Sequence, residues 1–195
     1  MSSSTSTRQL IHTRQINAQI FRRDDGLWDI EASLLDTKGK DFHLASGIKE
    51  KGEAIHHMVL TVTIDTHFNV VAANAKALSV PYPNYCDTIE AEYSKLVGLN
   101  LLSGFRRAIK ELFDGVKGCS HISELCTVIP TVAIQGFAGE VFQLGEREGE
   151  KHQEMPFQLN RCHALRTDGP AVKKYYKTWF GRAVQPTELP KKKNS

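Results

Sequence analysis

The chain of 195 residues lacks several features that would assign it to a protein class. It has no run of about 20 apolar residues, which argues against a transmembrane helix. Residues 1–7 are mainly serine and threonine, not a basic segment leading into an apolar run, so we expect no secretory signal. The basic surplus is small, 25 side chains against 22 acidic ones, and Lys191–Lys193 near the end of the chain account for much of it. We therefore expect neither membrane nor nucleic-acid partners.

Motifs of common enzyme classes are absent as well. The sequence contains no P-loop, no glycine fingerprint of a dinucleotide-binding fold, no H-E-x-x-H and no G-x-S-x-G. Its cysteines form no C-x-x-C pair; they are Cys86, Cys119, Cys126 and Cys162. Without an export signal, this spacing predicts reduced thiols in a cytoplasmic protein, and neither a disulfide framework nor a zinc ribbon.

The composition is that of a folded protein, with 41% hydrophobic and 24% charged residues. The length favours one domain, which we place at residues 8–182, with flexible termini at 1–7 and 183–195. Within it, Gly145–Glu154 has the composition of a charged linker.

Alternation of apolar and polar residues predicts β-strands in the amino-terminal half. From Trp28 to Leu35 the apolar residues fall on one face and the polar ones on the other. A looser alternation runs from Leu10 to Phe21, and Asp24-Asp25-Gly26 between the two segments predicts a hairpin turn.

A second hairpin is expected further along. Ile55–Ile64 places Met58, Leu60, Val62 and Ile64 on one side, and Asp65-Thr66-His67 then turns the chain into Phe68–Ala77. Between the hairpins, Thr37–Glu53 contains three glycines and four lysines, which predicts a mobile surface loop.

The pattern becomes helical after Pro81-Tyr82-Pro83. We expect helices from Asp87 to about Val97, over Phe105–Phe113, and from Ser120 to Phe137 with a kink at Pro130. The aromatic segment Lys173–Arg182 is either a docked helix or a partner surface. Strands followed by helices predict an α+β fold, an antiparallel sheet of about four strands in the amino-terminal half covered on one face by helices of the carboxyl-terminal half.

Two segments carry candidate catalytic residues. His56 shares its strand face with the apolar residues of Ile55–Ile64, so it is either a structural histidine or a site residue, whereas His57 should face solvent. Cys119 and His121 lie at the expected start of the third helix, where free N–H groups and the helix dipole favour a thiolate beside a proton acceptor. The alternative is that Cys119 only fills space and Ser120 only caps the helix; we expect Cys126, on the apolar stripe, to be core.

Carboxylates and a further thiol complete the candidates. Asp24, Asp29 and Asp36 could act as a general base, as its orienting group or as oxygen ligands for a metal ion, although turn chemistry and a solvated strand face also explain the first two. Cys162 could join His56, Cys119 and His121 in a metal site, for which zinc is the metal that these ligand types suit.

Several of these segments recur in a known family. They include Arg23–Asp29, Asp36–Lys38, His56–Met58, Pro81-Tyr82 with Cys86, Gly118–Leu125, Ala133–Gln135 and Cys162–Ala164. From about residue 8 to 180 the sequence resembles a bacterial family classified only as a domain of unknown function. The resemblance gives no reaction or cofactor, but it ranks the aspartate, histidine and cysteine candidates above neighbours such as Cys126 and His57.

Two functions are compatible with these residues. The first is a small cytoplasmic enzyme, a lyase or hydrolase using acid–base or metal-assisted chemistry on a small organic molecule that could be aromatic. His56 or His121 would be the base, an aspartate its orienting group, and Cys119 a ligand or thiolate. The second is a ligand-binding or accessory protein without turnover. Either form could be a homo-oligomer.

Overall fold

The computed structural model describes residues 6–142 and 155–182. The expected charged linker and nearly all of the expected flexible termini lie outside these residues. The chain forms two compact units, residues 1–136 and 137–195, and each is described by itself. One domain over residues 8–182 stays a prediction.

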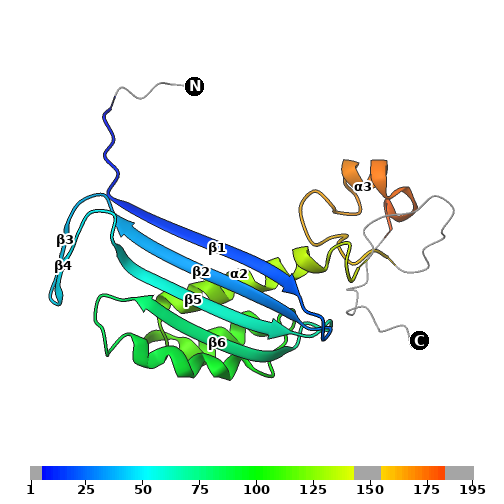
Figure 1. Cartoon of the computed structure of the whole chain (residues 1–195). Helices are drawn as coiled ribbons and strands as arrows, with labels where there is room; N and C mark the ends of the chain where they lie inside the picture. Colours follow the sequence, from blue (N-terminus) through cyan, green and yellow to red (C-terminus); the bar gives the residue numbers. More distant parts are fainter. Residues whose placement is uncertain (1–5, 143–154, 183–195) are drawn as a thin grey trace. The chain divides into compact units, whose positions relative to one another are not determined.

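The first unit is built on a four-stranded antiparallel sheet with the strand order β1-β2-β5-β6 (Figure 1). Its strands are β1 (His12–Arg22), β2 (Trp28–Lys38), β5 (Ala54–Ile64) and β6 (Val70–Ser79). Strands that follow each other in sequence pair as hairpins, and β2 also pairs with β5. The expected sheet of four strands is confirmed.

The turn between β1 and β2 has the predicted chemistry. Gly26 takes a φ of +82°, which a side chain would make costly. The carboxylate of Asp25 accepts the N–H of Leu27, and the N–H of Arg23 closes the turn on the carbonyl of Leu27. Counting outward from this turn fixes which residues of the two strands face each other.

The segment Thr37–Glu53 is not simply a loop, so that prediction was wrong. It contains a two-stranded hairpin of β3 (Phe42–Leu44) and β4 (Gly47–Lys49), and Ser46 at its turn donates a hydrogen bond to the carbonyl of Pro81. Strands of three residues are too short to give a period-two signal.

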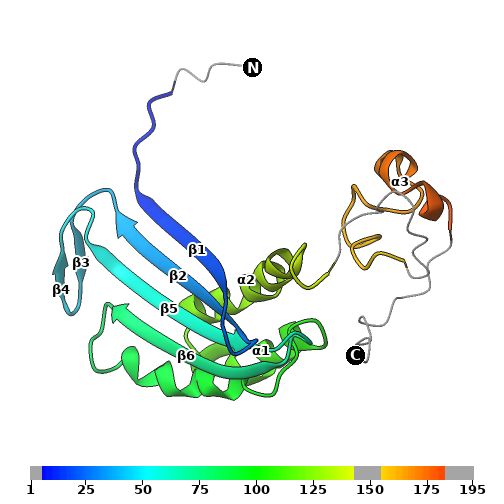
Figure 2. The same ribbon diagram turned by 45° about the vertical axis from the view of Figure 1, so that its right-hand side comes forward.

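Helices cover one face of the sheet (Figures 1 and 2). They are η1 (Asp87–Leu96), α1 (Phe105–Phe113), η2 (Gly115–Lys117) and α2 (Ser120–Phe137), the last with Pro130 inside it. The first is a 3-10 helix whose start has no side-chain cap, because Glu90 instead accepts the N–H of Ala77 on β6 at 2.7 Å. The predicted α+β arrangement is confirmed.

The core lies between the sheet and these helices. It contains Ile30, Ala32, Leu34, Met58, Leu60 and Val62 from the sheet, and Phe105, Ile109, Ile122, Leu125, Cys126, Ile129 and Ala133 from the helices. The predicted inward faces of β2, β5 and α2 and the burial of Cys126 are therefore confirmed. Among the described residues, no helix has the length and apolar composition needed to cross a membrane.

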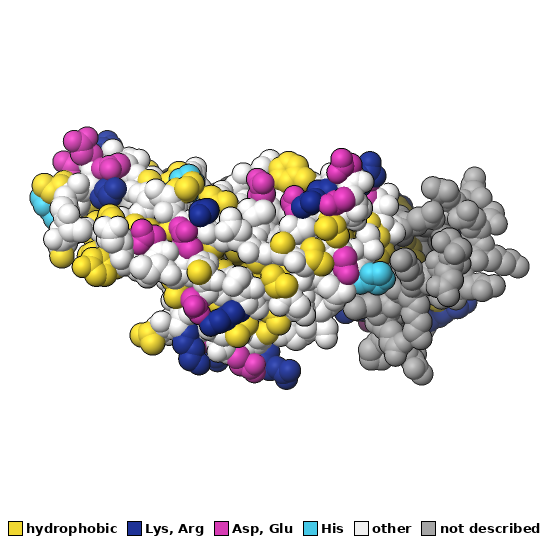
Figure 3. Space-filling model, turned by 60° about the horizontal axis from the view of Figure 1, so that its bottom comes forward, with side chains coloured by type: hydrophobic (Ala, Val, Ile, Leu, Met, Phe, Trp, Pro, Cys, Tyr) yellow, Lys and Arg dark blue, Asp and Glu magenta, His cyan; other side chains and the backbone are white. Residues whose placement is uncertain are grey.

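The surface of the described residues carries charge of both signs. Figure 3 looks onto the underside of the view in Figure 1 and shows acidic and basic side chains interspersed with hydrophobic ones. Side chains of both charge signs therefore lie close together on this face.

The second unit contains α3 (Pro170–Tyr175) and η3 (Lys177–Trp179). Trp179 is 6% exposed and packs with Leu159 and Val172 in a small cluster of its own. The aromatic segment is thus docked within this unit through Trp179, while Tyr175 and Phe180 stay exposed.

Candidate functional site

The inward face of β2 ends in a buried carboxylate, that of Asp36. The residues Trp28, Ile30, Ala32 and Leu34 alternate into the core, and the next position on that face is Asp36, whose side chain is 2% exposed. Removing a carboxylate from water is costly unless charged or hydrogen-bonding groups surround it. The partners of Asp36 therefore define the site.

Strand register brings two of these partners to Asp36. Arg14 on β1 and His56 on β5 are the residues directly opposite Asp36 on its two neighbouring strands. Arg14 donates from Nε to Oδ1 and from Nη2 to Oδ2, both at 2.8 Å, a two-pronged pairing that fixes the carboxylate. Nδ1 of His56 lies 3.2 Å from Oδ2.

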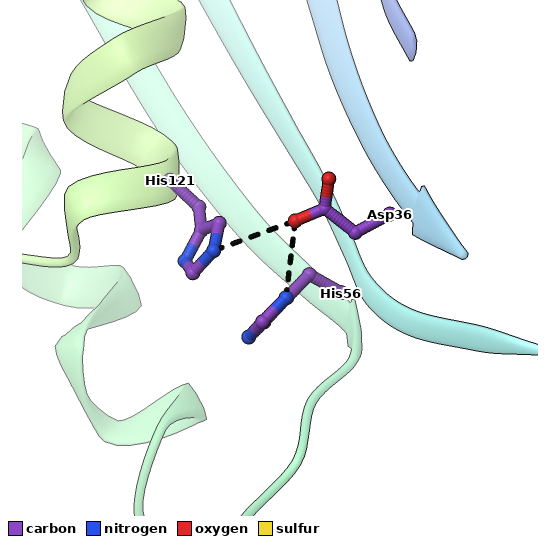
Figure 4. Close-up of side chains that lie close together, drawn as sticks. All are labelled: Asp36, His56 and His121. Carbon is purple, nitrogen blue, oxygen red and sulfur yellow. Dashed lines mark hydrogen bonds and ion pairs between the residues drawn. The ribbon is translucent and has the colours of Figure 1, made fainter. Parts of the chain in front are cut away.

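The first turn of α2 adds a second histidine. Nε2 of His121 lies 3.5 Å from Oδ2 of Asp36. The ring of His121 stacks on that of His56 with 3.7 Å between centroids and 26° between planes. Figure 4 shows both rings meeting the same carboxylate oxygen, with the second nitrogen of His56 turned away from Asp36.

Tyr93 on η1 fixes the start of α2. Its hydroxyl accepts the N–H of Cys119 at 3.0 Å, donates to the Cys119 carbonyl at 2.9 Å, and lies 2.9 Å from Oγ of Ser123. The side chain is fully buried and stacks on Phe113, and burial raises the pKa of Tyr93 to about 12. The neutral hydroxyl thus holds the turn that carries His121.

The site keeps a negative charge on Asp36. Burial is the largest single influence and would raise the pKa of this carboxyl, but the hydrogen bonds and positive charge of Arg14, with smaller contributions from His12 and His56, outweigh it. The pKa of Asp36 therefore lies below its ordinary value, and the group is ionised at neutral pH.

The two histidines, in contrast, are held neutral. Burial lowers the pKa of His56 below 6.5, although Asp36 pulls in the opposite direction. Burial also lowers the pKa of His121, and the charge that His56 carries when protonated and the charge of Arg14 lower it further. At neutral pH His56 therefore donates a hydrogen bond to Asp36 as an uncharged ring, and the 3.5 Å contact of the neutral His121 with Asp36 is not an ion pair.

Sequence reasoning missed three members of the cluster. They are Arg14, His12, whose Nε2 lies 3.2 Å from Oδ1 of Asp36, and Glu124 on α2, which pairs with Nη1 of Arg14. The inward alternation of β1 and the Asp24–Gly26 turn together pair Arg14 with Asp36, so a signal for Arg14 was present in the sequence.

Solvent reaches the edge of this cluster. The side chains of His56 and His121 are 21% and 19% exposed, and those of His12 and Arg14 are 37% and 35% exposed. Both rings are therefore partly buried but still accessible to solvent.

Of the other predicted site residues, one lies beside the Asp36 cluster and three lie elsewhere. Cys119 lies beside the cluster, with Sγ 3.7 Å from Nδ1 of His121, where a thiol donates a weak hydrogen bond. Asp29 is seven residues from Asp36 along β2, about 23 Å away, and is bonded to Thr63 and Arg23. Asp24 is exposed in the turn at that same distant end, so neither aspartate joins the cluster. Cys162 is exposed and belongs to the second unit.

A metal could use the ligand atoms of Asp36, His56 and His121, which lie within 4.8 Å of one another. The geometry fits this role poorly as it stands. An imidazole nitrogen binds a metal along a lone pair in the ring plane, and two stacked rings inclined by 26° direct their lone pairs along separate planes. Arg14 already occupies both oxygens of Asp36. Zinc on His56, Cys119, His121 and Cys162 stays a prediction, and binding at the histidines would require one ring to rotate.

A comparison with known protein families assigns most of the sequence to one family. The family model described as "Protein of unknown function (DUF2889)" matches residues 12–135, more than half of the chain. The chain belongs to the DUF2889 family. The expected family of unknown function is thereby confirmed.

The DUF2889 match contains the whole cluster, from His12 on β1 to Glu124 on α2, whereas Cys162 lies beyond its end. No curated protein and no solved structure matches the chain. What this member of DUF2889 does must therefore be argued from the cluster itself.

Proposed function

We propose that the chain is a small acid–base enzyme, a lyase or hydrolase that acts on a small organic molecule at the Asp36 cluster. The observation that carries the proposal is the pair of neutral, stacked and partly exposed histidines bonded to one buried, ionised carboxylate. Perturbed titratable groups that converge at a solvent-accessible edge are typical of catalytic sites.

His56 is the proposed general base. When Nδ1 donates its proton to Asp36, Nε2 keeps a free lone pair, and Figure 4 shows this nitrogen pointing away from the carboxylate. Asp36 fixes the tautomer and stabilises the imidazolium that forms when Nε2 takes a proton, the role that the carboxylate has in a catalytic triad. A lyase would take that proton from carbon and a hydrolase from water.

His121 is the proposed partner of His56 in returning the proton to the leaving group. The two rings share one carboxylate oxygen, so a first proton on the pair is balanced by Asp36, whereas a second would place two positive charges 3.7 Å apart between ring centroids. Such coupled groups titrate in two separate steps. Both rings are neutral in the resting site, so the acid is formed only after His56 has taken a proton from the substrate. The pair then contains one acid and one base, and an elimination can return that proton to the leaving group.

Other features of the chain bear on the compartment, the substrate and the partners of the proposed enzyme. The four cysteines are free, which fits the reducing cytoplasm. A small-molecule substrate suits a cluster confined to a few side chains at one end of the sheet. We retain the homo-oligomer, and the absence of nucleic-acid and membrane partners, as predictions.

The proposal is tested with two probes that need no knowledge of the natural substrate. In 5-nitrobenzisoxazole a base removes the ring C–H proton as the N–O bond breaks, giving a coloured cyanophenolate; 4-nitrophenyl acetate reports hydrolysis. We expect turnover of at least one probe about 100-fold faster than by equimolar free imidazole. The rate should rise with pH and reach half its maximum below pH 6.5, because the base must be unprotonated and its pKa is lowered. Rates equal to those of imidazole for both probes would contradict it.

A further inference from the structure

We propose that the groove between β1 and α2 binds the apolar body of the substrate, an uncharged and elongated molecule whose polar end reaches the Asp36 cluster. This inference rests on the proposed function. The groove has a volume of about 420 Å³ and is lined by Ala18, Ile20, Thr131, Val132, Gln135 and Gly136. That volume lies within the range of roughly 300–1,000 Å³ typical of small-molecule sites.

The strand and the helix are joined at both ends of the groove. At one end, Arg14 of β1 pairs with Glu124 of α2. At the other, Gly136 passes so close to the strand that a Cβ there would lie 2.4 Å from Cγ2 of Ile20. From Arg14 to Ile20 the strand spans about 20 Å, so the opening between these two contacts is bounded in length.

The groove and the cluster lie along the same face of β1. Residues two apart in a strand share a face, so Arg14, Ile16, Ala18 and Ile20 all point to the same side of β1. Ile16, between the groove and Arg14, is 39% exposed on the face whose counterpart in β2 is buried. This uncovered apolar side chain lies between the residues that line the groove and the charged cluster, where it could contact a ligand that extends from one to the other.

Charge and length define the ligand class. Around the site, the two carboxylates of Asp36 and Glu124 face the single guanidinium of Arg14. This balance does not favour an anionic head group. Ala18 is four residue steps from Arg14, about 13 Å, so a ligand that fills the groove and reaches the cluster has an extended alkyl or aromatic body.

Binding of N-phenyl-1-naphthylamine, an uncharged dye that fluoresces in apolar surroundings, tests the groove directly. We expect the full chain to bind it, and Val132→Trp, which fills the groove from α2, to weaken binding at least about 10-fold. Thr131→Trp, at an exposed lining position that tolerates a large residue, should also weaken it. Val71→Trp on the exposed face of β6 is the matched control and should bind like the unmodified chain.

Three outcomes would overturn the inference: no dye binding by the unmodified chain, equal affinity of folded Thr131→Trp, or affinity that falls as protein concentration rises. The last would make the groove an interface between copies. Dye binding requires no turnover, so the groove can fail while the histidine probes succeed. Turnover of the probes can likewise fail while the dye still binds.

Discussion

Replacing Arg14 with methionine should destabilise the first unit by roughly 3 kcal/mol at neutral pH. The substitution keeps the unbranched, mainly apolar stem of the side chain but removes both 2.8 Å hydrogen bonds to Asp36 and leaves a carboxylate of 2% exposure without its cation. Chemical denaturation measures the change. Arg106→Met on the exposed face of α1 is the control and should stay within about 0.5 kcal/mol of the unmodified chain.

The effect of Arg14→Met should shrink as pH falls. Arg14 lowers the pKa of both histidines, so its loss allows His56 and His121 to protonate more easily and to replace the missing charge beside Asp36. Adding Asp36→Asn should recover part of the stability, because no uncompensated charge is left. An Arg14→Met variant as stable as the Arg106→Met control at every pH would show that the ion pair does not hold the cluster.

Replacing His56 with glutamine should reduce turnover of the responsive probe by roughly 100-fold or more while the protein stays folded. Glutamine can still donate a hydrogen bond to Asp36, but it has no nitrogen that accepts a proton near neutral pH. His57→Gln is a matched control, since it removes the neighbouring histidine on the opposite face of the same strand. It should retain the rate of the unmodified chain.

The same pair of variants separates an enzyme from a ligand-binding protein. If the cluster only stabilises the fold, His56→Gln should lower the melting temperature without a selective loss of rate. An equal loss of rate in His56→Gln and His57→Gln would also contradict the assignment of His56 as the base.

Local patterns were sufficient to predict most of the fold. The period-two alternation of β2, the Asp24–Gly26 turn and the helical spacing of Phe105–Phe113 each depend on residues close in sequence. The β3–β4 hairpin and the 3-10 form of η1 were not predicted. The hairpin is too short to show a period, and η1 starts without a side-chain cap.

The candidate site could be predicted only in part, because it depends on contacts between residues far apart in the sequence. Asp36, His56 and His121 were candidates, but their convergence depends on how β2 pairs with β5 and where α2 lies on the sheet. The β3–β4 hairpin separates β2 from β5, so no tight turn fixes their register. The pairing of Arg14 with Asp36 is different, because the turn between β1 and β2 determines it.

Alternation along β2 also contained a signal that was not used. Asp36 occupies the next inward position after Leu34, where an apolar residue would continue the core. A carboxylate in such a position requires buried partners, which distinguishes Asp36 from Asp24 and Asp29. Burial inferred from strand parity is therefore a better guide to this site than the local density of acidic residues.

The most direct test of the central claim is a nitrogen-15 NMR titration of the imidazole rings in the unmodified chain, with His56→Gln and His121→Gln used for assignment. The account predicts that His56 and His121 are both uncharged at pH 7, that each titrates below pH 6.5, and that His56 carries its proton on Nδ1. A positive charge on either ring at pH 7, or a His56 proton on Nε2, would contradict it.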